Sequence, residues 1–152
     1  MCSIQKGTLL SYERNEKSTT IFLLLLSLIV AVILSPKDAY FLANFSYYWL
    51  PQAIVYALLF ALKFRLAVIA GAIIALTISL IGYSMFNDSM AWIGYMFIVP
   101  VGFFGSMSYG FFLKSKETVS FSEALVSATF CTITAIAIAQ FILCSTVMYC
   151  GF

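Results

Sequence analysis

Two glutamines are the most polar side chains within the long uncharged stretches of this sequence. Gln52 lies near the start of the helix predicted at 47–62, and Gln140 lies in the second half of the helix predicted at 122–148. A buried amide side chain seeks both donors and acceptors of hydrogen bonds. We expect the two glutamines to bind each other and so to join two helices, which would contribute about 1 kcal/mol. A hydrogen bond of this kind is a better explanation for them than a substrate site.

Groups that transfer protons or bind metal ions are scarce. The sequence contains no histidine, and its acidic residues form no pair within an apolar stretch. Proton and ion transporters usually place ionisable side chains at bilayer depth, and general acid–base catalysis needs such groups within reach of a substrate. We therefore predict a protein that is not an enzyme and has no cofactor or metal site. A net charge of +2 gives no indication of a nucleic-acid partner.

The four cysteines include no Cys-x-x-Cys pair. Cys144 and Cys150 are the two expected to lie close to an oxidising compartment, where disulfides persist. Six residues apart on a continuous helix they would face different directions, so a disulfide requires the helix to end after about Thr146. We favour their interpretation as two small apolar side chains, and the disulfide is the alternative.

Pro100 falls in the middle of an apolar stretch, where it removes one helical hydrogen bond and crowds the carbonyl group of Met96. Gly102 and Gly105 follow it closely. Proline and glycine are common in membrane helices, so a static kink is the favoured interpretation. A hinge or gate at Pro100 is the alternative.

Small residues recur at every fourth position in three of the apolar stretches. In lipid this spacing lets two helix backbones approach closely and gain van der Waals contact. The predicted packing residues are Gly71, Ala75 and Ser79, then Gly102, Ser106 and Gly110, and finally Ser127, Cys131, Ala135 and Ala139. We expect the last three helices to pack as a tight unit, and contact within the chain explains the pattern better than a face for a second protein.

The elements that carry these residues follow from the distribution of charge. Of the 152 residues, 63% are hydrophobic and only 9% are charged, whereas soluble domains carry about 25%. The charged residues are confined to the first 17 positions and four short islands. The stretches between them are each about 19 residues or longer, which suffices to cross a hydrocarbon core of about 30 Å. In lipid the backbone must satisfy its own hydrogen bonds, so helices are expected.

We predict an all-α integral membrane protein, a bundle of about five transmembrane helices. The helices should cover about 19–34, 47–62, 66–86, 91–113 and 122–148 within one domain at 19–149. A polar cytoplasmic tail at 1–18 and an outer tail at 150–152 should flank this domain. Aromatic residues at 40–49 should lie at the membrane interface. The spacing of Ser120 and Glu123 resembles a helix capping box.

The basic residues predict the orientation, because short loops rich in Lys and Arg remain cytoplasmic. With five spans, all but one of the Lys and Arg residues fall on a single side, and Lys37 lies on the other. The N-terminus should therefore be cytoplasmic and the C-terminus outside. We interpret the first apolar run as a retained signal anchor and expect the protein in a plasma membrane, with the bacterial inner membrane favoured.

The leading functional expectation is binding to another membrane component, as an accessory subunit or as an immunity factor against a pore-forming toxin. In size and in the lack of a soluble domain the chain resembles the small membrane immunity proteins of bacterial toxin systems, although no sequence motif carries the resemblance. Besides the bilayer, its partner would be a membrane protein or a second copy. An oligomeric channel or small transporter is the alternative, and a lipid-handling or membrane-integrity role, suggested by the aromatic residues, is a third.

Overall fold

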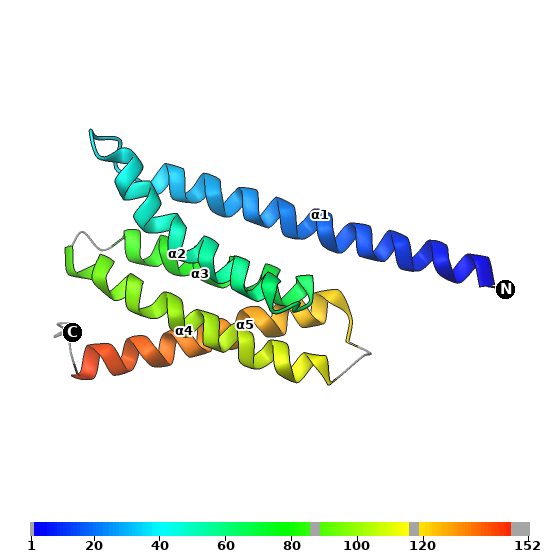
Figure 1. The fold of residues 1–152 in the computed structure, drawn as a ribbon. Helices are drawn as coiled ribbons and strands as arrows, with labels where there is room; N and C mark the ends of the chain where they lie inside the picture. The colour runs from blue at the N-terminus through cyan, green and yellow to red at the C-terminus, as the bar shows by residue number, and fades with distance from the viewer. Residues whose placement is uncertain (1, 86–88, 116–118, 147–152) are drawn as a thin grey trace.

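The computed structural model describes residues 2–85, 89–115 and 119–146, and these residues form helices and no strands. The prediction of an all-α fold is therefore confirmed for the described part of the chain. The described residues form five helices, and Figure 1 shows them arranged as a bundle. Their bounds are α1 Cys2–Leu34, α2 Phe41–Ala61, α3 Leu66–Ser84, α4 Ser89–Lys114 and α5 Phe121–Thr146.

Four of the helices are long and apolar enough to cross a membrane. The qualifying segments are Asn15–Leu34 of α1, Leu66–Ser84, Gly94–Lys114 and Phe121–Thr146. These segments indicate a membrane-embedded protein with several passes. α2 has sufficient length for a span but is not among these segments, and its first half carries Asn44, Ser46, Tyr47 and Tyr48.

The first helix is much longer than expected. A polar tail was predicted for residues 1–18, with a helix beginning near Thr19, but α1 is helical from Cys2 onward. The residues before Thr19 contain no proline, which would interrupt a helix. Figure 1 shows the N-terminal part of α1, in dark blue, projecting beyond the other four helices.

The second helix also begins earlier than predicted, at Phe41 instead of near Tyr47. Asp38 precedes it, and the carboxylate oxygen Oδ1 accepts a hydrogen bond from the backbone N–H of Tyr40 at 2.9 Å. The side-chain amide of Asn44 also donates to this oxygen at 3.4 Å. The aromatic run then continues as helix, with Phe45 stacked between Phe41 and Trp49 at ring distances of 6.3 and 6.1 Å.

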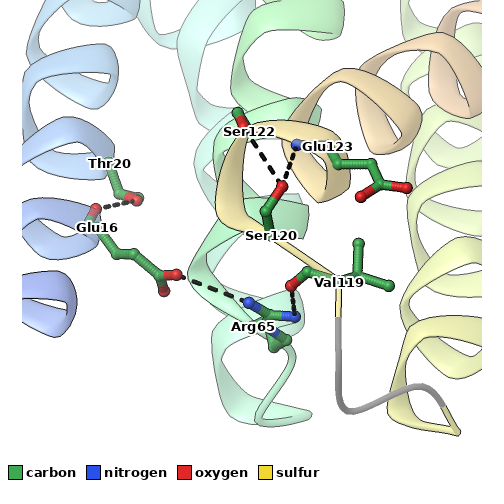
Figure 2. A network of polar contacts seen from close by, with 7 residues as sticks. All are labelled: Glu16, Thr20, Arg65, Val119, Ser120, Ser122 and Glu123. Atoms are coloured by element: carbon green, nitrogen blue, oxygen red, sulfur yellow. Dashed lines mark hydrogen bonds and ion pairs between the residues drawn. The ribbon is translucent and has the colours of Figure 1, made fainter. Parts of the chain in front are cut away.

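The remaining helix ends differ from the prediction by about two residues or fewer, and positions 86, 147 and 148 lie outside the described residues. At the start of α5, the hydroxyl of Ser120 accepts a hydrogen bond from the backbone N–H of Glu123 at 3.3 Å (Figure 2). This contact is one half of the expected capping box. The turn between α2 and α3 places Lys63 in the left-handed region at φ 55°.

The last three helices pack as the tight unit predicted from the sequence, with the most extensive contacts between α4 and α5 and between α3 and α5. α3 is central and touches all four other helices. Residues 67–73 are buried without a break, and Ala75, Leu76 and Leu80 are fully inaccessible, whereas Ile78 and Ile81 are exposed. α1 is attached mainly through α3 and makes few contacts with α2. α3 therefore serves as the axis of the bundle.

The α2–α3 turn and the α4–α5 link lie at the same end of the bundle, beside α1 near Glu16. Arg65 connects all three, since its guanidinium lies 3.7 Å from the Glu16 carboxylate and donates to the carbonyl oxygen of Val119 at 3.1 Å (Figure 2). Lys114 reaches the same end, where its ammonium group donates to the carbonyl oxygen of Leu62 at 3.2 Å. The α1–α2 link lies at the opposite end (Figure 1).

Candidate functional site

The most polar part of the interior is a cluster around the side chain of Gln52, which is fully buried on α2. Its amide nitrogen donates to the hydroxyl of Tyr95 on α4 at 2.6 Å and to the carbonyl oxygen of Tyr48 at 3.2 Å. Its amide oxygen accepts from Tyr56 at 2.7 Å and from Ser27 on α1 at 3.2 Å. We call Ser27, Tyr48, Gln52, Tyr56 and Tyr95 the Gln52 cluster.

The Gln52 cluster uses the whole hydrogen-bonding capacity of the amide. A glutamine side chain has two N–H donors and an oxygen with two lone pairs, and all four positions are filled by groups of this chain. The Tyr95 hydroxyl also donates to the Tyr48 carbonyl oxygen at 3.3 Å. A ligand would have to displace one of these partners, so the cluster is suited to joining α1, α2 and α4 and not to receiving a solute.

Gln140 belongs to a second polar group, and the expected direct bond between Gln52 and Gln140 is not formed. The Gln140 amide oxygen accepts from the hydroxyl of Tyr83 on α3, and its nitrogen donates to the sulfur of Cys144 at 3.3 Å. The Tyr83 and Tyr95 rings meet edge to face at 5.8 Å. The two amides therefore lie on either side of a tyrosine pair. The prediction missed this because several tyrosines were equally plausible partners.

Cys144 is disulfide-bonded, so its interpretation as a free apolar side chain is wrong. The described part of α5 ends at Thr146, and Cys150 lies outside the described residues. Cys131, which was predicted to lie within the bilayer, is a half-buried free thiol on α5. Its sulfur contacts the carbonyl oxygen of Gly105 on α4 at 3.6 Å.

Glycines allow the closest approach between α3, α4 and α5. A Cβ atom at Gly71 would lie 2.7 Å from the Cβ of Ala128, and one at Gly105 would lie 2.8 Å from the Cβ of Ala135. Real Cβ atoms do not come this close, so these positions need glycine. One at Gly102 would meet Leu76 at 2.9 Å. At these three glycines the backbones of the helices can therefore approach their neighbours closely.

The other predicted packing residues vary in burial. Ala75 and Ser106 are fully buried, Gly110 packs under the ring of Phe64, and Ser79 is half-buried and donates to its own helix. On α5 the predicted stripe is only half-buried, at Ser127, Cys131, Ala135 and Ala139. The buried residues of α5 are Ala124, Ala128, Thr132 and Ile136.

Both stripes of α5 contact α4, and the buried stripe also contacts α3. Ala128 contacts Gly71 of α3, whereas Ala135 and Cys131 contact Gly105 of α4. The Thr132 hydroxyl lies between them and shares a hydrogen bond of 2.7 Å with the Ser106 hydroxyl of α4. Reading every fourth small residue identified the side facing α4. It missed the buried stripe, in which Ile136 lies against Gly102 of α4, because Thr132 and Ile136 are not small and broke the pattern.

Pro100 lies within α4, which continues as one helix from Ser89 to Lys114. Its side chain is on the exposed side of the helix. Gly102 and Gly105, which would provide freedom in the alternative interpretation as a hinge, pack against residues of α3 and α5. Whether Pro100 acts as a static kink or as a hinge stays a prediction.

A groove of about 610 Å³ separates α1 from α2, with α3 as its floor. Its walls are almost entirely apolar and include Ile21 and Leu24 of α1, Ala57 and Phe60 of α2, and Ile69 of α3. We call it the α1–α2 groove. It opens at one end onto a shallow recess of about 580 Å³ that shares Lys17, Phe60 and Leu66 with it and also contains Glu16, Lys63 and Arg65.

Lys17, Lys63 and Arg65 form what we call the basic shelf. The sequence suggested that basic residues gather on one side, but it did not show that Arg65 is held by Glu16 of α1, because 49 positions separate them. Among the described residues, no group of three or more His, Cys, Asp or Glu side chains is arranged to bind a metal ion. No protein-family model, curated protein or solved structure matches the chain at a significant level.

Proposed function

We propose that the chain crosses the membrane five times, with its N-terminus in the cytoplasm and its C-terminus outside. α2 contains 21 residues, which corresponds to about 31 Å of helix and matches a hydrocarbon core of about 30 Å. Lys17, Lys63, Arg65 and Lys114 gather at one end of the bundle, as the positive-inside rule requires. This orientation is the one expected in a bacterial inner membrane.

The disulfide of Cys144 supports the same orientation. Cys144 lies near the end of α5, which Figure 1 places away from the α2–α3 turn and its basic residues. Disulfides persist in oxidising compartments outside the cytoplasm. Reporter fusions at the two ends test the proposal: a periplasmic reporter should be active only at the C-terminus, and a cytoplasmic one only at the N-terminus. Both ends on one side would exclude five spans.

We propose further that the protein acts without catalysis, by binding another membrane protein as an accessory subunit or immunity-type factor. The observation that carries this proposal is that Gln52, the most polar group of the interior, has all four hydrogen bonds within the chain. A membrane-protein partner would then bind to the outer surface of the bundle. The outer face of α1 offers Phe22, Leu25, Ile29 and Ile33, which are each at least half exposed.

The partner can be sought by photo-crosslinking in intact membranes. A photoreactive residue at Leu25 or Ile29, on the outer face of α1, should capture a discrete membrane protein, and the same residue at the buried position Ile73 should not. Helices in lipid associate through close van der Waals contact, so a specific partner should give one adduct. Crosslinks to lipid alone from every exposed position would contradict the proposal.

An oligomeric channel or small transporter is the second candidate, and its support is Pro100 inside α4. Its exposed position would allow Pro100 to face a neighbouring copy. Reconstitution into liposomes tests this function directly. A flux of ions or small solutes that Pro100→Ala changes would favour the channel, and the absence of any flux would remove it.

A further inference from the structure

We propose that the α1–α2 groove binds one acyl chain of an anionic phospholipid, with the headgroup on the basic shelf. The groove and the shelf are continuous, because Lys17, Phe60 and Leu66 line both. An apolar cleft that ends at a cluster of cations matches an amphiphile with a hydrocarbon tail and a negatively charged head. The proposal goes beyond binding to a protein partner and does not depend on it.

The size of the groove fits a single hydrocarbon chain. Its volume of about 610 Å³ lies in the range of small-molecule pockets. Along α2 it extends from Trp49 to Phe60, which corresponds to about 16 Å at 1.5 Å per residue. The length is also about half of a 30 Å hydrocarbon core, the depth that one leaflet supplies.

The charge of the shelf selects the headgroup. Lys17, Lys63 and Arg65 surround the recess, and Glu16 is the one acidic residue among its lining side chains. The Glu16 carboxylate lies 3.7 Å from the Arg65 guanidinium, which also donates to Val119 (Figure 2). These contacts position Arg65 at the edge of the recess. Basic residues at this depth attract anionic lipids of the adjacent leaflet.

The headgroup must therefore determine which phospholipid binds more tightly. Lipid tails are as apolar as leucine, so an acyl chain gains little by leaving the bilayer for the groove. Any phospholipid can therefore fill the groove, and the shelf distinguishes an anionic lipid from a zwitterionic one. The proposal predicts selectivity for charge, with a site that the groove limits to one molecule.

Native mass spectrometry of the full chain in detergent tests this prediction. The protein is titrated with phosphatidylglycerol or with phosphatidylcholine of the same chain length. The first phosphatidylglycerol should bind about fivefold or more tightly than the first phosphatidylcholine. Lys17→Gln should reduce the affinity for phosphatidylglycerol about fivefold and leave that for phosphatidylcholine unchanged.

Two bulky substitutions on α2 test the groove itself. Ala57 is exposed and lines the groove, so Ala57→Trp should fill it and abolish the first binding event for both lipids. Ile54 is 51% exposed on the same helix and is not among the groove residues, so Ile54→Trp should have no effect. Thermal unfolding checks that both variants fold, and Lys17→Gln supplies an independent test if Ala57→Trp does not.

Equal affinity for the two lipids, or unchanged binding by Ala57→Trp, would overturn the proposal. So would a homodimer or a partner helix that Ala57→Trp displaces, since the groove would then hold protein. Loss of the α1 crosslink with lipid selectivity intact would reject the proposed partner and leave the lipid site standing. Loss of lipid selectivity with the α1 crosslink intact would reject the lipid site and leave the proposed protein partner standing.

Discussion

Gln52 of α2 and Tyr95 of α4 are fully buried and are joined by a hydrogen bond of 2.6 Å between the amide nitrogen and the phenol oxygen. They lie 43 positions apart in the chain. Because Ser27 of α1 also binds the Gln52 oxygen, one side chain ties three helices together. Within an apolar bundle this contact fixes which faces of the helices meet, a role attested for buried polar residues elsewhere.

Gln52→Leu should destabilise the fold more than Tyr95→Phe. Leucine removes all four amide hydrogen bonds and leaves the buried hydroxyls of Tyr95, Tyr56 and Ser27 without this partner, so we expect a loss of about 1–3 kcal/mol. Tyr95→Phe removes one hydroxyl and should cost about 1 kcal/mol. Unfolding in sodium dodecyl sulfate titrations measures both, with the exposed Ser108→Ala as control. A Gln52→Leu variant as stable as the native protein would contradict the role given to the cluster.

Gly71→Ala and Gly82→Ala form a matched pair on α3. A Cβ at Gly71 would meet the Cβ of Ala128 at 2.7 Å, whereas one at Gly82 would have no neighbour within 4 Å. Gly71→Ala should force α3 and α5 apart and cost about 1–3 kcal/mol. Gly82→Ala should stabilise the helix by about 0.4–1 kcal/mol, because alanine restricts the unfolded chain. The same titration compares them, and equal effects would refute the close packing of α3 on α5.

The sequence predicted the helices well because charge is costly in lipid. The islands at Lys37 and Asp38 and at Lys63 and Arg65 lie in links between helices, within two or three residues of a helix end. The extension of α1 to Cys2 was not predicted, because residues 2–18 lack the continuous apolar character by which the spans were recognised. Helix propensity, not hydropathy, governs that segment.

The partners within the bundle were harder to predict than the helices. Gln52 and Gln140 were singled out from the sequence, and both have partners within the chain. These partners are tyrosines, at 56 and 95 for Gln52 and at 83 for Gln140. Which of several tyrosines meets an amide depends on the rotation of each helix about its axis. A stripe of small residues predicts this rotation only to within about one residue. In α5 the buried residues Ala124, Ala128, Thr132 and Ile136 lie one position along from the predicted stripe.

Thr132→Val should weaken the contact between α4 and α5. The substitution keeps the shape of the side chain and removes the hydroxyl that lies 2.7 Å from the Ser106 hydroxyl. Interhelical hydrogen bonds of this kind are worth about 0.6–1.7 kcal/mol in membranes. Thr134→Val is the matched control, since the Thr134 hydroxyl is exposed and bonds only to the Phe130 carbonyl of its own helix. A loss of stability as large for Thr134→Val as for Thr132→Val would show that the pair contributes nothing.

Lys63→Gly should stabilise the turn between α2 and α3. Lys63 has φ 55°, a conformation that costs a residue with a Cβ about 1–2 kcal/mol and glycine almost nothing. Glycine loses more conformational freedom on folding, at about 0.5–1 kcal/mol, so the expected gain is about 1 kcal/mol or slightly less. Lys63→Ala distinguishes the effect of the backbone conformation from that of the lost charge. It removes the same ammonium group as Lys63→Gly and keeps the backbone strain. If the two variants unfold at the same detergent concentration, the left-handed conformation of Lys63 is not a source of strain in the folded protein.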